Sequence, residues 1–319
     1  MAAFDKVKSG ISQLDEILDY IRMGDNVVWE VSDVEEFRMF ALPFVAQAIN
    51  DKRDIVYIRF AQHPPILTQP DMLAHVQVAE FDPDAGFESF TVAIHDEITR
   101  HGKDAFYVFD CLSELQSVWY TDLMMGNFFR VTCPYLFELD TVAYFPILRG
   151  RHSFDAIARI RETTQLLLNV YTNEKWIYLH PVKVWQRNSE TMFLPHGCRK
   201  EEGELRLIDD GVGISRYYQT VHEIRQQSQD QNIDSYDRFY SMAKAAYAAG
   251  YFTGHMEDQI IDSMMTKDSH LKELVQKYFM PKDYFVVRDR MVGSGAIGGK
   301  ACGMLLARKI AETERLPRL

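Results

Sequence analysis

The chain has 319 residues, of which 47% are hydrophobic and 13% aromatic; this suits about two globular domains and excludes a mainly disordered chain. Its formal net charge of −11 argues against general nucleic-acid binding, because a negative protein repels phosphate backbones. No apolar run reaches the ~18 residues that a bilayer requires, so no membrane partner is expected. The N-terminus has no basic start followed by an apolar stretch, and the four cysteines are widely spaced, so we expect a cytoplasmic protein with reduced thiols.

Over residues 1–214, short apolar runs alternate with helical patterns, which is typical of a parallel sheet flanked by helices. Strands are expected at 26–31, 54–60, 76–81 and 105–109, and helices at 35–50 and 87–101. A long helical pattern covers 154–171, and the short strands 176–180 and 182–185 are expected to form an antiparallel edge joined through Pro181. We therefore predict an α/β fold for this first region.

The remainder of the chain divides into two further regions. Residues 215–279 are helical and rich in polar side chains, as in a helical connector. Residues 280–319 predict a short strand at 284–287, a glycine-rich loop, and a helix from about Lys300. Because one strand, one loop and one helix cannot enclose a core, we expect this part to pack on the preceding region or to open a longer domain.

The glycine-rich loop, GSGAIGGKA at 293–301, has the composition of a phosphate site. Glycines let backbone amides approach an anion, a helix start adds partial positive charge, and Lys300 adds a full one. The P-loop pattern fails, since Ser294 stands where its first glycine belongs and Ala301 follows the lysine. The dinucleotide pattern GxGxxG is met, but it also needs a second strand and an acid further along. A glycine-rich turn with a solvated lysine is the structural alternative.

A third family fits this segment better. The stretch GSGAIGGKACGMLLARKI resembles the opening of the ATP-grasp-like nucleotide-binding domain of phosphoenolpyruvate synthase and pyruvate phosphate dikinase. The resemblance implies that Lys300 contacts ATP phosphates, while Gly295, Gly298 and Gly299 allow the close approach. It also implies ATP and Mg²⁺ as cofactors of a longer parent protein. We expect no catalytic residue, no metal ligand and no bound cofactor in this chain alone, and the downstream catalytic domains of the same protein as its partners.

The first 200 or so residues resemble KaiC-like members of the RecA ATPase group in the leader at 9–18, the strand at 26–31 and the Walker-B-like strand ending at Asp110. Where the phosphate loop should begin, the sequence instead reads EVSDVEEF (30–37), with no glycine or lysine but with Asp33, Glu35 and Glu36. Carboxylates at a helix start stabilise the helix and repel triphosphate. The resemblance therefore implies a degenerate domain that has lost nucleotide hydrolysis, with Asp110 a structural remnant.

Two functions remain open from the sequence. In the first, the chain is the regulatory or assembly region of a phosphotransferase, itself not catalytic, with Lys300 as the first element of an ATP site. In the second, it is a stand-alone, non-catalytic interaction or oligomerisation module that forms homo-oligomers. The turn RGRHS (149–153) bears on both, because its two arginines and His152 could bind an anion or a neighbouring subunit. The alternative is a solvated or helix-capping turn before Asp155.

Overall fold

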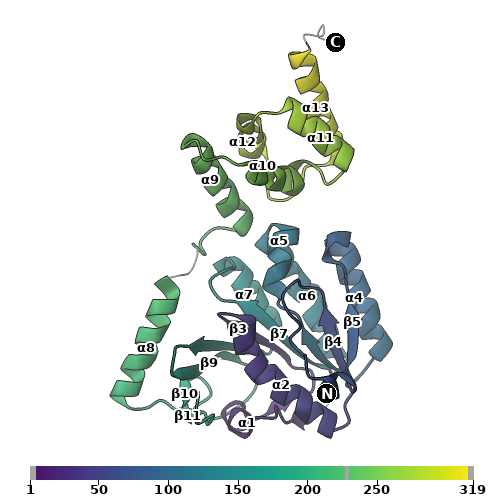
Figure 1. Ribbon diagram of the computed structural model, residues 1–319. Helices are drawn as coiled ribbons and strands as arrows, with labels where there is room; N and C mark the ends of the chain where they lie inside the picture. Colours follow the sequence, from purple (N-terminus) through teal and green to yellow (C-terminus); the bar gives the residue numbers. More distant parts are fainter. Residues whose placement is uncertain (1–4, 227–229, 315–319) are drawn as a thin grey trace. The chain divides into compact units, whose positions relative to one another are not determined.

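The computed structural model describes residues 5–226 and 230–314. They form two compact units: unit 1, Met1–Val118 with Leu123–Asn232, and unit 2, Trp119–Asp122 with Ile233–Leu319 (Figure 1). This division differs from the predicted boundaries, since the first helix of the expected connector lies in unit 1 and residues on both sides of 280 share one core. Within the described ranges, no helix combines the length and apolar character needed to cross a membrane.

Unit 1 is built on a sheet of nine strands in the order β11-β10-β9-β8-β3-β7-β6-β4-β5. The strands are β3 (Asn26–Val31), β4 (Ile55–Arg59), β5 (Gln77–Glu80), β6 (Phe106–Phe109), β7 (Val142–Leu148), β8 (Leu166–Thr172), β9 (Trp176–Val184), β10 (His196–Arg199) and β11 (Arg206–Leu207). The six from β3 to β8 pair in parallel, and β9 to β11 are antiparallel. The predicted α/β fold with a mainly parallel sheet is confirmed. A separate two-stranded sheet joins β1 (Lys6–Val7) to β2 (Ile21–Arg22).

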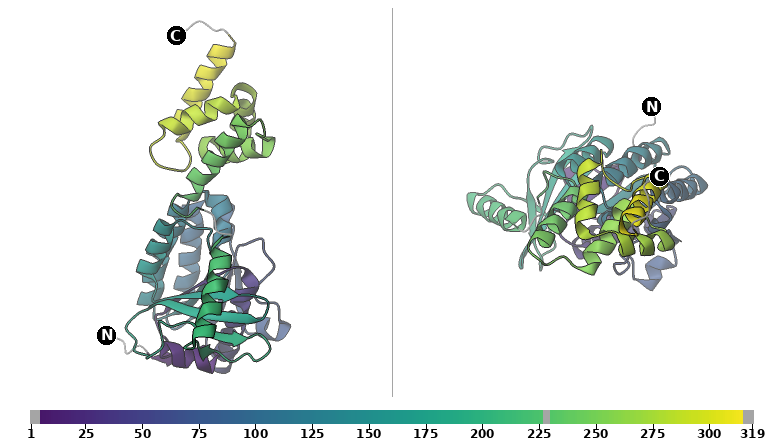
Figure 2. Two further views of the ribbon diagram at one scale, coloured as in Figure 1. Left: turned by 90° about the vertical axis from the view of Figure 1, so that its left-hand side faces the viewer. Right: turned by 90° about the horizontal axis from the view of Figure 1, so that it is seen from above.

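Helices cover both faces of the large sheet (Figures 1 and 2). On one face lie α1 (Ser12–Leu18) and α2 (Val34–Asn50); on the other lie α4 (Phe87–His101), α6 (Asp122–Glu138) and α7 (Phe154–Thr163). Helix α8 (Gly211–Gln226) packs through Tyr217 against the rings of Tyr171 on β8 and Tyr178 on β9. The short helices are α3 (Pro70–Leu73), α5 (Gln116–Trp119), η1 (Pro83–Ala85) and η2 (Leu112–Leu115).

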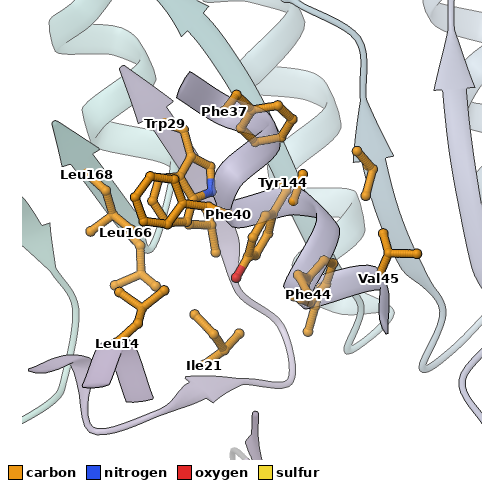
Figure 3. Packing of buried hydrophobic residues seen from close by; sticks show 14 of the residues in the cluster. Leu14, Ile21, Trp29, Phe37, Phe40, Phe44, Val45, Tyr144, Leu166 and Leu168 are labelled. Carbon is orange, nitrogen blue, oxygen red and sulfur yellow. The ribbon is translucent and has the colours of Figure 1, made fainter. Parts of the chain in front are cut away.

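Aromatic side chains join α2 to the sheet (Figure 3). Trp29 of β3 stacks on Phe40 with ring centroids 4.4 Å apart, and Phe44 stacks on Tyr144 of β7 at 4.0 Å. All four side chains are at most 4% exposed. Burial of large rings contributes strongly to stability, so α2, and with it the loop that precedes it, is firmly placed at the centre of the sheet.

Two predictions on the antiparallel side were wrong. The helical pattern at 154–171 is helix α7 only to Thr163, and then becomes strand β8. The strand is buried and apolar, so periodicity could not separate it from a buried helix. The two strands around Pro181 are one strand, β9, and the register slips between Leu167 and Leu168, next to the proline that cannot donate to the ladder. Strands β10 and β11 extend the sheet beyond it.

Unit 2 is helical. Its elements are α9 (Ser235–Ala248), α10 (Gly254–Ile260), a π turn η3 (Ile261–Met265), α11 (Ser269–Tyr278), α12 (Pro281–Arg290) and α13 (Gly299–Thr313). The predicted strand at 284–287 was wrong, because these residues lie inside α12. The signals for a helix were Pro281 at its first position and Asp283, whose carboxylate accepts from the Met280 amide at 2.9 Å. Tyr284 and Phe285 are buried in the core that all these helices share.

Candidate functional site

The loop between β3 and α2 lies at a switch point of the unit 1 sheet. The chain leaves β3 toward β4, whereas it leaves the neighbouring β7 toward β8 in the opposite direction. Ligands of α/β proteins bind at the carboxyl ends of strands at such points. A pocket of about 420 Å³ lies here, lined by Ser32, Asp33, Glu36, Arg149, Thr172, Asn173, Thr220, Glu223 and Ile224.

Carboxylates of the chain itself accept hydrogen bonds from two amides at this loop, those of Ser32 and Glu36. Asp33 caps α2, accepting from the Glu36 amide at 2.9 Å. The buried Glu36 side chain turns back and accepts from the Ser32 amide at 2.6 Å and from the Thr172 hydroxyl. Burial raises the pKa of the Glu36 carboxyl, and these hydrogen bonds oppose the rise. An incoming phosphate would meet two amides that are already bonded, with two carboxylates beside them, and this arrangement disfavours a triphosphate.

The arrangement of Asp33 and Glu36 has a signal in the sequence. An N-cap residue followed three positions later by glutamate is the spacing of a capping box, in which the glutamate bonds an amide before the helix. This spacing predicts that the carboxylates at the start of α2 bond backbone amides, in addition to bringing negative charge.

The side chains of the turn after β7 bond neighbouring groups of unit 1. The Arg149 guanidinium donates to the carbonyls of Glu30 and Val170, both at 2.6 Å, and lies 3.9 Å above the ring of Tyr171. Ser153 accepts from the Ala156 amide at 3.3 Å and caps α7, so the predicted capping role is present. His152 is not solvated: it is fully buried, with Nε2 2.6 Å from Ser113 Oγ.

Asp110, which follows the end of β6, is fully buried, and its carboxylate accepts four hydrogen bonds. Its Oδ2 accepts from Arg59 at 2.5 Å and from the amides of Phe60 and Ala61 at 2.9 Å each, while Oδ1 accepts from the Tyr57 hydroxyl. Three of these donors bond Oδ2 and one bonds Oδ1, so the carboxylate is held in place from several sides. This geometry supports the structural role expected for Asp110.

The glycine-rich loop of unit 2 presents the opposite chemistry. Gly293 and Gly295 have φ of +88° and +94°, which favour glycine. Gly298 is the N-cap of α13 and has no side chain to bond the amides of the first turn. The Lys300 side chain, on the second residue of the helix, is exposed and forms no hydrogen bond or ion pair within the described part of the chain.

This loop fits a phosphate contact. A methyl group added at Gly298 or Gly299 would meet no atom within 4 Å, so the backbone there is open to an approaching group. Helix amides and an unpaired ammonium are the groups that phosphate binds. Of the four predicted residues, Gly298, Gly299 and Lys300 are exposed, and Gly295 is partly buried with its carbonyl accepting from the Tyr236 hydroxyl at 3.0 Å. The solvated-lysine alternative remains compatible with the same geometry.

Comparisons with known proteins add no family to this description. No protein-family model matches the chain, and no curated protein matches it. Over residues 5–226 and 230–314, no three His, Cys, Asp or Glu side chains are grouped so as to hold a metal ion. Function is therefore inferred from the two loops.

Proposed function

We propose that the chain is the non-catalytic front region of an ATP-dependent phosphotransferase similar to phosphoenolpyruvate synthases and pyruvate phosphate dikinases. Lys300 is the first element of its ATP site, which other residues of the protein complete. The observation that carries the proposal is the exposed Lys300 ammonium at the uncapped start of α13, which has no partner among residues 5–226 and 230–314. Phosphoryl transfer depends on positioning and on neutralising charge, and this loop supplies one cation and several amides toward both. Mg²⁺, when bound with the nucleotide, neutralises further phosphate charge.

Unit 1 takes a regulatory or assembly role in this proposal. The bonded carboxylates of Asp33 and Glu36 support the loss of nucleotide binding at the β3–α2 loop. The parallel sheet and the buried Asp110 at the end of β6 are compatible with descent from a RecA/KaiC-like domain. A domain that keeps its sheet and loses its nucleotide site retains its surface, and a surface can serve contacts with other parts of a protein.

The test uses the protein that the complete gene encodes. Replacing Lys300 by alanine should weaken binding of Mg-ATP about 10- to 100-fold, the value of one charge-assisted hydrogen bond to phosphate. The matched control is Lys267→Ala, because Lys267 is also exposed and unpaired among the described residues of the same unit. Equal affinities of the two variants by calorimetry would overturn the proposal.

An interaction module is the second candidate, and the sheet edge at β5 favours it. In the described sheet β5 pairs on one side only, with β4, and its Val78 is 46% exposed. An open edge strand is a template for pairing with another chain, and lysine on the edge prevents it. Sedimentation should then show a self-associated species that Val78→Lys returns to monomer. A monomer at every concentration in the unmodified protein would exclude this candidate.

A further inference from the structure

Four residues, Trp119–Asp122, belong to unit 2 although their neighbours on both sides in the sequence belong to unit 1. Tyr120 packs against the core of unit 2. Helix α6 begins at Asp122, and the residues that follow it are part of unit 1. Unit 2 is therefore not a continuous stretch of sequence, and this tetrapeptide is a structural component of it.

Crossed carboxylate bonds fix the tetrapeptide to the start of α9. Asp234 Oδ2 accepts from the Asp122 amide at 2.9 Å, and Asp122 Oδ2 accepts from the Ser235 amide at 3.2 Å. Asp234 also caps α9 through the Tyr236 amide at 2.9 Å. Each aspartate thus bonds an amide at the beginning of the other's helix. Such caps stabilise the helices that they begin, so the join is well defined.

Thr121 connects this join to the glycine-rich loop. Its hydroxyl lies 3.1 Å from Asp234 Oδ2 and 3.3 Å from Ser294 Oγ. A carboxylate only accepts, so Thr121 donates its single proton to Asp234 and accepts the proton of Ser294. Ser294 lies between the two glycines with positive φ. Helix α9 makes the next contact along the loop: the Tyr236 hydroxyl donates to the Gly295 carbonyl at 3.0 Å.

We infer that Thr121 and Tyr236 are positioning residues, which hold the glycine-rich loop in one conformation, so that the tetrapeptide 119–122 sets the geometry of the surface carrying Lys300. Glycine-rich backbone loses more conformational freedom on ordering than any other. Bonds that order it in advance remove this cost from phosphate binding. The role in ligand binding rests on the proposed function; the restraint on the loop does not.

Hydrogen exchange of the full chain without ligand tests the restraint. The Ile297 amide, which donates to the Met264 carbonyl at 2.8 Å, reports opening of the loop. Thr121→Val removes the bonds to Asp234 and to Ser294, of which only the second reaches the loop. It should speed exchange of the Ile297 amide about fivefold, the factor for that one lost hydrogen bond. Thr121→Ser keeps the hydroxyl and should exchange like the unmodified protein. The control Thr253→Val removes a comparable cap, from the Met256 amide of α10, that makes no bond to the loop.

The second variant is Ser294→Ala, which removes the other partner at an exposed position and should speed exchange of Ile297 by a similar factor. Unchanged exchange in Ser294→Ala, or equal acceleration in Thr121→Val and Thr121→Ser, overturns the inference. The proposed function fails by a different result, namely unchanged Mg-ATP affinity in Lys300→Ala. Either proposal can therefore fail while the other stands.

Discussion

The carboxylate of Glu36 accepts a hydrogen bond from the backbone amide of Ser32 at 2.6 Å, so the first turn of α2 folds back on the loop that precedes it. In a nucleotide-binding loop, amides at this place would be directed at a phosphate. Here the Glu36 carboxylate accepts the hydrogen bond instead. Unit 1 thus carries its own anions where a triphosphate would have to bind.

Replacing Glu36 by alanine should lower the free energy of unfolding by about 1–3 kcal/mol, because the Ser32 amide and the Thr172 hydroxyl lose their partner. The control is Glu35→Ala. The Glu35 side chain is 73% exposed and pairs with Arg38 at the surface, so its loss should cost less than about 1 kcal/mol. Urea unfolding measures both. Similar losses in the two variants would show that Glu36 does not hold the loop.

Removing Arg59 should destabilise unit 1 strongly. Its guanidinium lies 2.5 Å from the fully buried Asp110, and a buried charge deprived of its partner typically costs about 3–5 kcal/mol. Arg59→Met keeps much of the aliphatic bulk and removes the charge. For comparison, Lys103→Met breaks an exposed pair with Asp140 at 3.8 Å and should cost less than about 1 kcal/mol. Equal losses of stability in the two variants, measured by thermal unfolding, would show that Arg59 does not compensate the buried charge of Asp110.

Replacing two tyrosines of the sheet by phenylalanine should change the free energy of unfolding in opposite directions. Within the described residues, the buried hydroxyl of Tyr144 has no hydrogen-bond partner, so Tyr144→Phe should raise the free energy of unfolding by about 1 kcal/mol. The Tyr57 hydroxyl donates to Asp110 and accepts from the Ile66 amide at 2.8 Å. Tyr57→Phe should therefore lower it by about 1–3 kcal/mol. A loss in both variants would mean that the Tyr144 hydroxyl is bonded.

The four cysteines should be unreactive in the folded protein. All are free and buried, and burial raises the pKa of the Cys111 thiol to about 12. The thiolate is the reactive form, so a neutral, inaccessible thiol resists disulfide reagents. Titration with a chromogenic disulfide should detect no thiol near neutral pH and four in guanidinium. Fast reaction of any thiol in the native state would contradict the burial.

Local patterns predicted part of the fold well. Helix α4 was expected at 87–101 and is found there, because its apolar residues repeat at helical spacing and glycines stand at both ends. Strand β8 was assigned to a helix, since a strand buried on both faces shows no alternation. Strands β10 and β11 are short and partly polar, and no run of apolar residues marked them.

The candidate site was predictable in its charges but not in its bonds. The acids after β3 and the lysine after the glycines could be read directly from the sequence. The Thr121–Ser294 contact could not, because it joins residues 173 positions apart and depends on a tetrapeptide that belongs to unit 2 while its neighbours in sequence belong to unit 1. Side-chain bonds between distant segments follow from tertiary packing, and no local spacing indicates them.

Titration of Mg-ATP into this chain by calorimetry tests the central claim most directly. We predict little or no heat in the unmodified chain and in Lys300→Ala, because the carboxylates of Asp33 and Glu36 close the first loop and the second loop supplies only part of a site. Strong binding that persists in Lys300→Ala would place a working nucleotide site in unit 1 and contradict the account.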